Sequence, residues 1–479
     1  MDPDVPPTET RVERPVRVLD AIAVALVVLI AWKILSAETR AGIFDLLPRV
    51  RALFLFYVLG GVLLVRHIMR PRPSLPERAR LAWRAVADEP TWGPAVRAFV
   101  STRSMVFVVG FFAVVTFGLN RPGFVLSAHP LYNLPARFDA GYYGSIAVDG
   151  YDRDRVFDRQ RNIAFFPAMP LLMRALGPVV GANKTGLPRE HRMARMLWAG
   201  VLISLVSFLL ALYYLMKLGT FLLDEQRAAG AVLLTATYPF ACFYNAPYTE
   251  SLLLLGTIAA SFHFLRGQFA RAAAWGLVVG LTRPNGFLLS VPLGLLALQQ
   301  LRLAIPGDVS VRGREMVKAL VAAAMPVVGM LAFTAYLHTV TGAWFAWQKN
   351  HAAWGRSFTG VEPMTRGLGW LADEGIVQVA TNIPFDVLNT AGATFAVLML
   401  WPVFRRVGPV WALYVAVTIV PPMFAGGALS LARLSSTLFP VFLALAAILP
   451  SRAVPSWAAA FAILQGLCAA LFFTWRELF

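Results

Sequence analysis

The stretch "MVFVVGFFAVVTFGL", residues 105–119, decides the fold class, because it contains no charged side chain. A similar run, "AIAVALVVLIAW", covers residues 21–32. A helix needs roughly 17–25 apolar residues to cross the hydrocarbon core of a bilayer, which is about 30 Å thick. The whole chain is 58% hydrophobic and only 14% charged, against roughly 25% charged residues in a soluble domain. These features predict an all-α, polytopic helical membrane protein.

The apolar runs predict about 13 membrane helices. With the N-terminus inside, the arginine-rich segments fall in inner loops, as the positive-inside rule requires. The run 272–301 has basic flanks at both ends, so the chain must cross and return within it. The break is "TRPNG", residues 282–286, since Pro284 and Gly286 disfavour a continuous helix. Irregular backbone at this depth must be covered by protein or water. The runs are 18–35, 50–69, 104–120, 196–216, 228–245, 249–265, 272–301, 317–341, 388–404, 409–426, 432–449 and 455–474.

The charge and the rare residue types exclude several function classes. The net charge of +17 comes from arginines in loops, and no nucleic-acid-binding motif accompanies it. Loops facing an anionic leaflet explain this charge, so we expect membrane lipids and no nucleic acid as partners. Cys242 and Cys468 lie far apart in apolar runs and predict neither a disulfide nor a thiolate site. The histidines lack the spacing of a metal site, and no cofactor is expected.

The predicted outer loop 121–195 carries the stretch "FDAGYYGSIAVDGY", residues 138–151. A short helix is expected over 138–148, with Tyr143 on its packed face. Asp139 at its start has two interpretations: a cap for the helix N-terminus, or a carboxylate base at the membrane rim. Tyr142 and Tyr143 could bind a sugar or a headgroup. Asp149 lies before Gly150, in a position typical of a turn.

Six motifs give the chain a resemblance to PIG-V-type mannosyltransferases, relatives of GPI mannosyltransferase II within the GT-C superfamily. The resemblance covers roughly residues 104–450, and one departure is Phe138, where tryptophan is usual. The motifs are "RFDAGYYGSIAVDGY" (137–151), "AFFPAMPLLMRALG" (164–177), "FYNAPYTESLLLL" (243–255), "GLTRPNGFLL" (280–289), "FAWQKNHAAWGR" (345–356) and "LARLSSTLFPVFLALA" (431–446).

The resemblance implies a glycosyltransferase that moves a sugar, mannose, from a polyprenyl-phosphate carrier to a hydroxyl of a lipid-linked or envelope acceptor on the outer face. It makes Asp139 the presumed base and Asp149 a second candidate. The domains then expected are a disordered tail over 1–17, an extra hairpin with a basic inner linker over 18–103, and a GT-C-like module over 104–479. Its outer loops would be 121–195 and 342–387.

The chemistry also needs cations that hold the departing phosphate. Candidates are Arg283, Arg433, Lys349 and Arg356, although each could instead reach the headgroups by snorkelling. An arginine at membrane depth costs roughly 2.5–3.5 kcal/mol on insertion scales, so Arg283 is expected to have a partner. Glu250 either complements a helix dipole, pairs with Arg283 or binds sugar hydroxyls.

Two further groups of residues complete the predicted site and its surroundings. Arg137 and Asp149 are included among the substrate-binding residues. Four tryptophans are interpreted as interface anchors outside the site: Trp344, Trp347, Trp354 and Trp370.

Two other function classes fit parts of the sequence. A transporter or flippase for lipid-linked sugars would suit a broken helix with an arginine at membrane depth. A non-catalytic membrane partner is the third interpretation. The composition favours a bacterial inner membrane, with the active site on its outer face.

Overall fold

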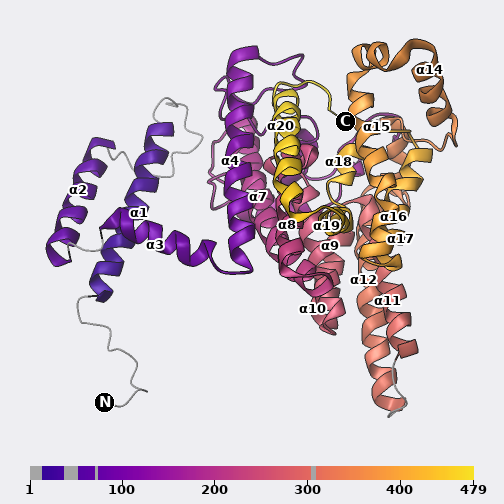
Figure 1. The fold of residues 1–479 in the computed structure, drawn as a ribbon. Helices are drawn as coiled ribbons and strands as arrows, with labels where there is room; N and C mark the ends of the chain where they lie inside the picture. The colour runs from indigo at the N-terminus through magenta and orange to yellow at the C-terminus, as the bar shows by residue number, and fades with distance from the viewer. Residues whose placement is uncertain (1–12, 37–51, 71–73, 304–308, 479) are drawn as a thin grey trace. The chain divides into compact units, whose positions relative to one another are not determined.

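The computed structural model describes residues 13–36, 52–70, 74–303 and 309–478, and every regular element in these ranges is helical. The chain divides into two compact units, residues 1–89 and 90–479. Figure 1 labels the helices of both units. The described residues therefore confirm the predicted all-α class.

The first unit consists of α1 (Glu13–Ser36), α2 (Ala52–Met69) and α3 (Leu75–Ala87). Asp20 of α1 accepts hydrogen bonds from Arg66 Nε of α2 at 2.9 Å and from Arg78 Nη1 of α3 at 2.6 Å. This carboxylate thus connects all three helices. The first helix begins at Glu13, earlier than the predicted start at Val18, and the rest of the tail expected to be disordered lies outside the described residues.

The second unit contains the longest apolar helices. Among the described residues, five helices are long and apolar enough to cross a membrane, and the predicted total of about 13 crossings stays a prediction. Among the described residues of this unit, five apolar helices are shorter, and α9 (Glu250–Leu265) is buried along its whole length except for its last residue. The five long segments are Trp92–Phe117, Arg189–Leu222, Gly313–Thr341, Pro384–Arg406 and Ser451–Phe473.

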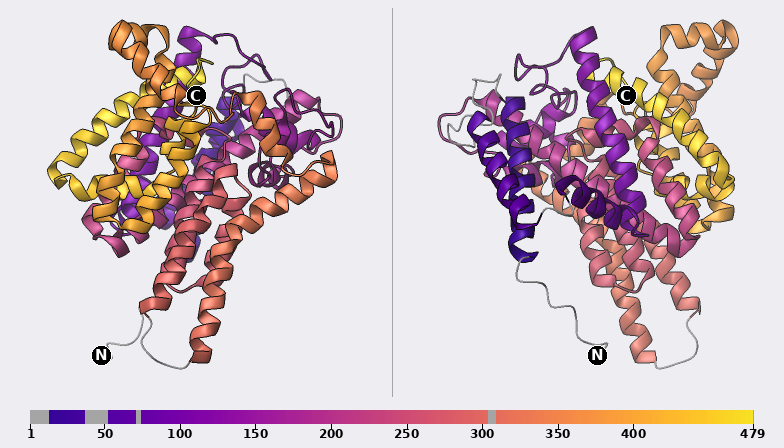
Figure 2. Two further views of the ribbon diagram at one scale, coloured as in Figure 1. Left: turned by 90° about the vertical axis from the view of Figure 1, so that its right-hand side faces the viewer. Right: turned by 60° about the vertical axis from the view of Figure 1, so that its left-hand side comes forward.

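The break predicted at "TRPNG" is present. α10 (Phe269–Gly280) ends there, the 3-10 turn η3 (Pro284–Leu289) follows, and α11 (Ser290–Leu303) continues. α11 and α12 (Val309–Thr341) run side by side, and their far ends project beyond the other helices of this unit, while α12 also packs against α10 (Figure 1, Figure 2). The chain thus changes direction at Arg283 inside an apolar run.

Two of the predicted apolar runs are not continuous helices in the structure. α8 (Glu225–Thr237) stops before Tyr238, and the wholly buried 3-10 segment η2 (Pro239–Asn245) replaces the end of the run 228–245. The run 432–449 splits into α18 (Leu431–Ser435) and α19 (Phe439–Ile448). Pro239 and Pro440 stand at the starts of the second elements, since proline lacks an N–H and restricts the residue before it.

The first predicted outer loop contains three short helices. These are α5 (Ala140–Asp149), η1 (Asn162–Ala164) and α6 (Ala168–Leu176). α5 confirms the helix expected over 138–148, and its buried face includes Tyr143, Ile146 and Ala147. This helix packs against α7 (Arg189–Leu222), which fixes the position of Asp139.

The second predicted loop contains α13 (Ala346–Asn350), η4 (His351–Trp354) and α14 (Glu362–Asn382). It meets the first loop through Asn350, which is fully buried. The Asn350 amide donates to Arg159 O at 2.8 Å, and its oxygen accepts from Arg161 N at 3.2 Å. The two loops therefore lie together.

The remaining helices complete the second unit around these loops. They are α4 (Trp92–Phe117), α15 (Pro384–Leu398), α16 (Leu400–Arg406), α17 (Pro409–Phe424), η5 (Ser451–Ala453) and α20 (Val454–Phe473). α4 starts at Trp92, so the end of the predicted linker, 92–103, is helical. The predicted division into domains stays a prediction.

Candidate active site

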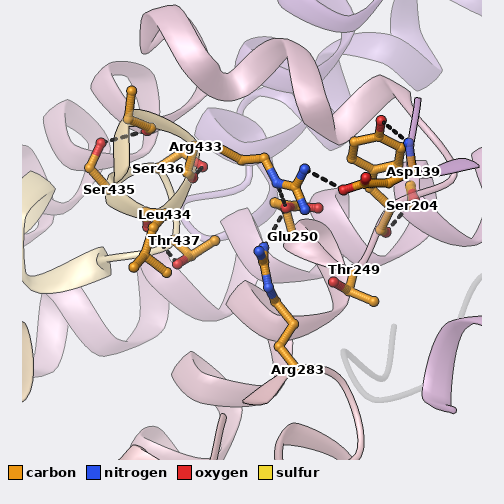
Figure 3. A network of polar contacts seen from close by, with 12 residues as sticks. Asp139, Ser204, Thr249, Glu250, Arg283, Arg433, Leu434, Ser435, Ser436 and Thr437 are labelled. Carbon is orange, nitrogen blue, oxygen red and sulfur yellow. Dashed lines mark hydrogen bonds and ion pairs between the residues drawn. The ribbon is translucent and has the colours of Figure 1, made fainter. Parts of the chain in front are cut away.

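Asp139 precedes the first residue of α5, but its side chain makes no capping hydrogen bond. Its Oδ2 accepts instead from Arg433 Nη1 of α18 at 2.7 Å, across 294 positions of sequence (Figure 3). The Asp139 side chain is 12% exposed and the Arg433 side chain 5%. Of the two interpretations of Asp139, the geometry disfavours the cap, because the carboxylate points at a cation and not at the helix N–H groups.

Glu250, the first residue of α9, lies at the centre of the charged cluster and is fully buried. Its Oε1 accepts from Arg433 Nε and from Arg283 Nη1 (Figure 3). Its Oε2 is buried without a hydrogen-bond partner among the described residues. The expected partner of Arg283 is thus confirmed, and the same carboxylate serves a second arginine.

Aromatic side chains surround this cluster. The Arg433 guanidinium lies 4.9 Å from the centre of the Tyr248 ring and 5.6 Å from that of Phe243. The Tyr248 hydroxyl donates to Arg137 O at 3.0 Å and accepts from Asp139 N at 3.1 Å. Tyr248 therefore fixes the backbone around Asp139 as well as covering Arg433, since a desolvated guanidinium is attracted to an aromatic face.

Tyr143 is the predicted tyrosine that faces the charged cluster. Its hydroxyl lies 3.3 Å from Thr249 Oγ1, directly before Glu250. Burial raises the pKa of Tyr143 to about 12, and the charges of Arg283, Glu250, Arg433 and Asp139 also act on it. It stays a neutral hydroxyl that can donate or accept.

Arg356 in the second loop approaches the same cluster. Its Nη2 donates to Leu429 O at 3.1 Å, just before α18. Burial, together with the nearby positive charges of Arg283 and Arg433, lowers the pKa of Arg356 to about 10. These three arginines face two carboxylates, Asp139 and Glu250, so the cluster has one positive charge in excess.

Three predicted residues lie outside this cluster. Arg137 is fully buried, and its guanidinium donates to the backbone oxygens of Phe473 at 2.6 Å, Asn133 at 2.6 Å and Ala136 at 2.7 Å. Asp149 is exposed at the end of α5 and pairs with Arg189 at 2.5 Å. Lys349 is exposed on α13. Their proposed substrate contacts gain no support from this arrangement.

Trp354 was predicted to be a membrane anchor, but its ring lies among loop residues near the site. It makes edge contacts with Tyr142, at 5.1 Å between ring centres, and with Phe165, at 5.5 Å. The residue three positions before it, His351, is partly buried, and this burial together with the Arg356 charge lowers its pKa to about 4. In the sequence, the feature that could have indicated His351 and Trp354 as site residues is their place in the motif 345–356.

The second unit thus combines apolar helices with a buried cluster of carboxylates and arginines, and ionisable groups in such a setting mark a candidate functional site. Residues 98–355, more than half of the chain, match the family described as mannosyltransferase (PIG-V). The chain belongs to this family. The predicted resemblance to PIG-V-type mannosyltransferases is therefore confirmed.

Two solved structures that the chain is similar to come from Archaeoglobus fulgidus. One is the oligosaccharyltransferase in complex with Zn and sulfate, and the other is the archaeal oligosaccharyltransferase AglB in complex with an inhibitory peptide and a dolichol-phosphate. The identities are 12% and 13%, with a TM-score of 0.37 in both cases. The matches cover 78% of this chain and 53% and 54% of those chains, so the chain spans about half their length. No curated protein matches the chain significantly.

Proposed function

We propose that the protein transfers mannose from a polyprenyl-phosphate carrier to a hydroxyl of a lipid-linked or envelope acceptor, on the outer face of a bacterial inner membrane. The observation that supports this most is the position of the Asp139 carboxylate. One of its oxygens accepts a hydrogen bond from Arg433, its side chain is 12% exposed, and it lies beside an excess of positive charge. A base and a phosphate site are thereby adjacent.

In the proposed reaction, Asp139 takes the proton of the acceptor hydroxyl as its oxygen attacks the anomeric carbon of the donor sugar. The bond between that carbon and the phosphate oxygen breaks, and polyprenyl phosphate leaves. Arg283, which is 15% exposed and has one nitrogen on Glu250, would hold the phosphate together with Arg356. Arg433 orients Asp139 by donating a hydrogen bond to its carboxylate.

Glu250 has a positioning role in this mechanism. By accepting from both Arg283 and Arg433 through one oxygen, it fixes the distance between the proposed phosphate site and the proposed base. Its second oxygen remains available to a sugar hydroxyl. Neither role requires Glu250 to exchange a proton during turnover.

The test is Asp139→Asn in the purified full-length protein, with a mannosylated polyprenyl phosphate as donor. Asparagine keeps the oxygen that Arg433 contacts and caps helices about as well as aspartate, but it is not a base. Release of polyprenyl phosphate should fall about 100-fold or more. The matched control is Asp158→Asn, an exposed aspartate of the same loop, which should retain activity.

Thermal unfolding of both variants is measured alongside. A stable Asp139→Asn protein with full activity would exclude Asp139 as the base. A wild-type protein that moves the lipid-linked sugar across the membrane of vesicles, without releasing polyprenyl phosphate, would contradict the proposed function as a whole.

A further inference from the structure

We propose that Tyr142, Phe165 and Trp354 form a platform for a carbohydrate ring of the acceptor, which rests on the function proposed above. The platform combines two segments: Tyr142 and Phe165 belong to the first loop, and Trp354 to the second. It adds an acceptor subsite built by both loops to the charged cluster already described.

The three rings contact one another directly. Tyr142 stacks on Phe165 with 4.6 Å between ring centres and 11° between ring planes. Trp354 meets Tyr142 at 5.1 Å and 68°, and Phe165 at 5.5 Å and 75°. All three residues are partly exposed, whereas the aromatic residues around Arg433, Tyr248 and Phe243, are buried. The trio is therefore a surface and not part of the packed interior.

The platform lies on the acceptor side of Asp139. Tyr142 follows Asp139 by one helical turn, and the Asp139 charge, after burial, contributes to raising the pKa of Tyr142. Arg283, in the break between α10 and α11, contacts Glu250 on the proposed phosphate side. An acceptor hydroxyl must contact the base and reach the anomeric carbon on the face opposite the phosphate, so the sugar that carries it would lie over α5.

The chemistry of the trio fits a carbohydrate ring. Aromatic faces carry partial negative charge and attract the polarised C–H groups on the apolar face of a pyranose. Two ring nitrogens nearby, Trp354 Nε1 and His351 Nε2, are buried without hydrogen-bond partners among the described residues. The low pKa of His351 keeps its imidazole neutral at pH 7, so the ring offers one donor and one acceptor nitrogen.

The first test measures binding without turnover. Saturation-transfer NMR is recorded with methyl α-D-mannopyranoside and the matching glucoside and galactoside, using the full-length protein in nanodiscs and no donor. Wild type should transfer saturation to the ring protons of at least one glycoside, and Trp354→Leu should lose this transfer. The control is Trp344→Leu, which removes an exposed tryptophan of the same loop, whose ring stacks on that of His338 in α12 with 4.2 Å between ring centres.

The second test uses the same glycoside as acceptor in the polyprenyl phosphate release assay. Trp354→Leu should raise the KM for the glycoside about tenfold and leave the KM for the donor within about twofold. Trp354→Phe, which keeps an aromatic face, should have an intermediate acceptor KM. Thermal unfolding of each variant shows whether it is folded. If Trp354→Leu does not fold, the comparison with wild type is made with Trp354→Phe.

The outcomes separate this inference from the proposed function. Equal glycoside binding by the Trp354 and Trp344 variants, or no binding of any glycoside by wild type, would overturn the platform. A wild-type protein that binds a glycoside through Trp354 but releases no polyprenyl phosphate would retain the platform and contradict the transferase mechanism.

Discussion

At the scale of single residues, the dominant feature is the shared carboxylate of Glu250. It is fully buried and pairs with both Arg283 and Arg433. Removal of one partner from a buried ion pair leaves an uncompensated charge and costs about 3–5 kcal/mol, whereas exposed pairs contribute about 0–1 kcal/mol. The stability of the second unit therefore depends strongly on Glu250.

We predict that Glu250→Gln lowers the free energy of unfolding by about 3–5 kcal/mol, because Arg283 loses its counter-charge and Arg433 keeps only that of Asp139. The matched control is Glu362→Gln, which removes a carboxylate from an exposed pair with Arg366 and should change stability by about 1 kcal/mol at most. Thermal unfolding in mild detergent measures both.

The double variant Glu250→Gln with Arg283→Gln tests the same pair. Since it also removes Arg283, the cation left without a counter-charge, it should recover part of the loss. Equal effects of Glu250→Gln and Glu362→Gln would show that the cluster does not stabilise the fold.

At the scale of elements, helix breaks and left-handed residues position the charged groups. Phe138 and Ser430 have φ of 42° and 58°, and they come directly before Asp139 and before α18, which carries Arg433. Such backbone is unfavourable for residues other than glycine, and it is maintained here by surrounding contacts. Phe138, for example, packs on Trp475 at 4.5 Å and on Phe472 at 5.9 Å.

Gly286 maintains the break that presents Arg283. A Cβ atom on Gly286 would lie 2.2 Å from Val279 O, a backbone atom of α10 that cannot move alone. Gly286→Ala should therefore destabilise the protein by about 1–3 kcal/mol and reduce polyprenyl phosphate release, because the break and Arg283 must shift.

The control is Gly294→Ala, on α11, where a Cβ atom would meet nothing within 4 Å. This variant should be as stable as wild type or slightly more stable, since alanine is the better helix former. Thermal unfolding and the release assay are compared for both variants. Indistinguishable results would mean that the break tolerates a side chain at residue 286.

At the scale of the whole molecule, the site is assembled from segments far apart in the sequence. The first loop supplies Asp139, α9 supplies Glu250, the α10–α11 break supplies Arg283, and α18 supplies Arg433. The second loop joins them through Asn350 on one side and Arg356 on the other. Because the two loops contact each other, they must lie on the same side of the membrane.

We predict that this side is the outer one. In intact cells, an impermeant maleimide should label Asp158→Cys and Ser357→Cys, both exposed loop positions, and should not label Arg406→Cys, in a predicted inner loop, until the cells are permeabilised. The native Cys242 and Cys468 are buried and should give little background. Labelling of Arg406→Cys in intact cells, without labelling of the loops, would invert the topology.

The sequence by itself determined the membrane class, most of the apolar helices and the break at 282–286, because hydrophobic length, proline and glycine act locally along the chain. It also indicated Asp139 as a candidate base. It predicted a partner for Arg283, since a charged side chain in an apolar run is energetically unfavourable. The motifs then indicated the family, which the family comparison confirmed.

Only the tertiary structure decided how the charged residues pair. Arg137 and Arg433 are both arginines in resembling motifs, yet one binds backbone oxygens and the other two carboxylates. The surroundings of Trp354 likewise differ from those of Trp344, because the first loop places the rings of Tyr142 and Phe165 beside Trp354. Such contacts join residues hundreds of positions apart, and they depend on how the helices pack, which no local pattern in the chain encodes.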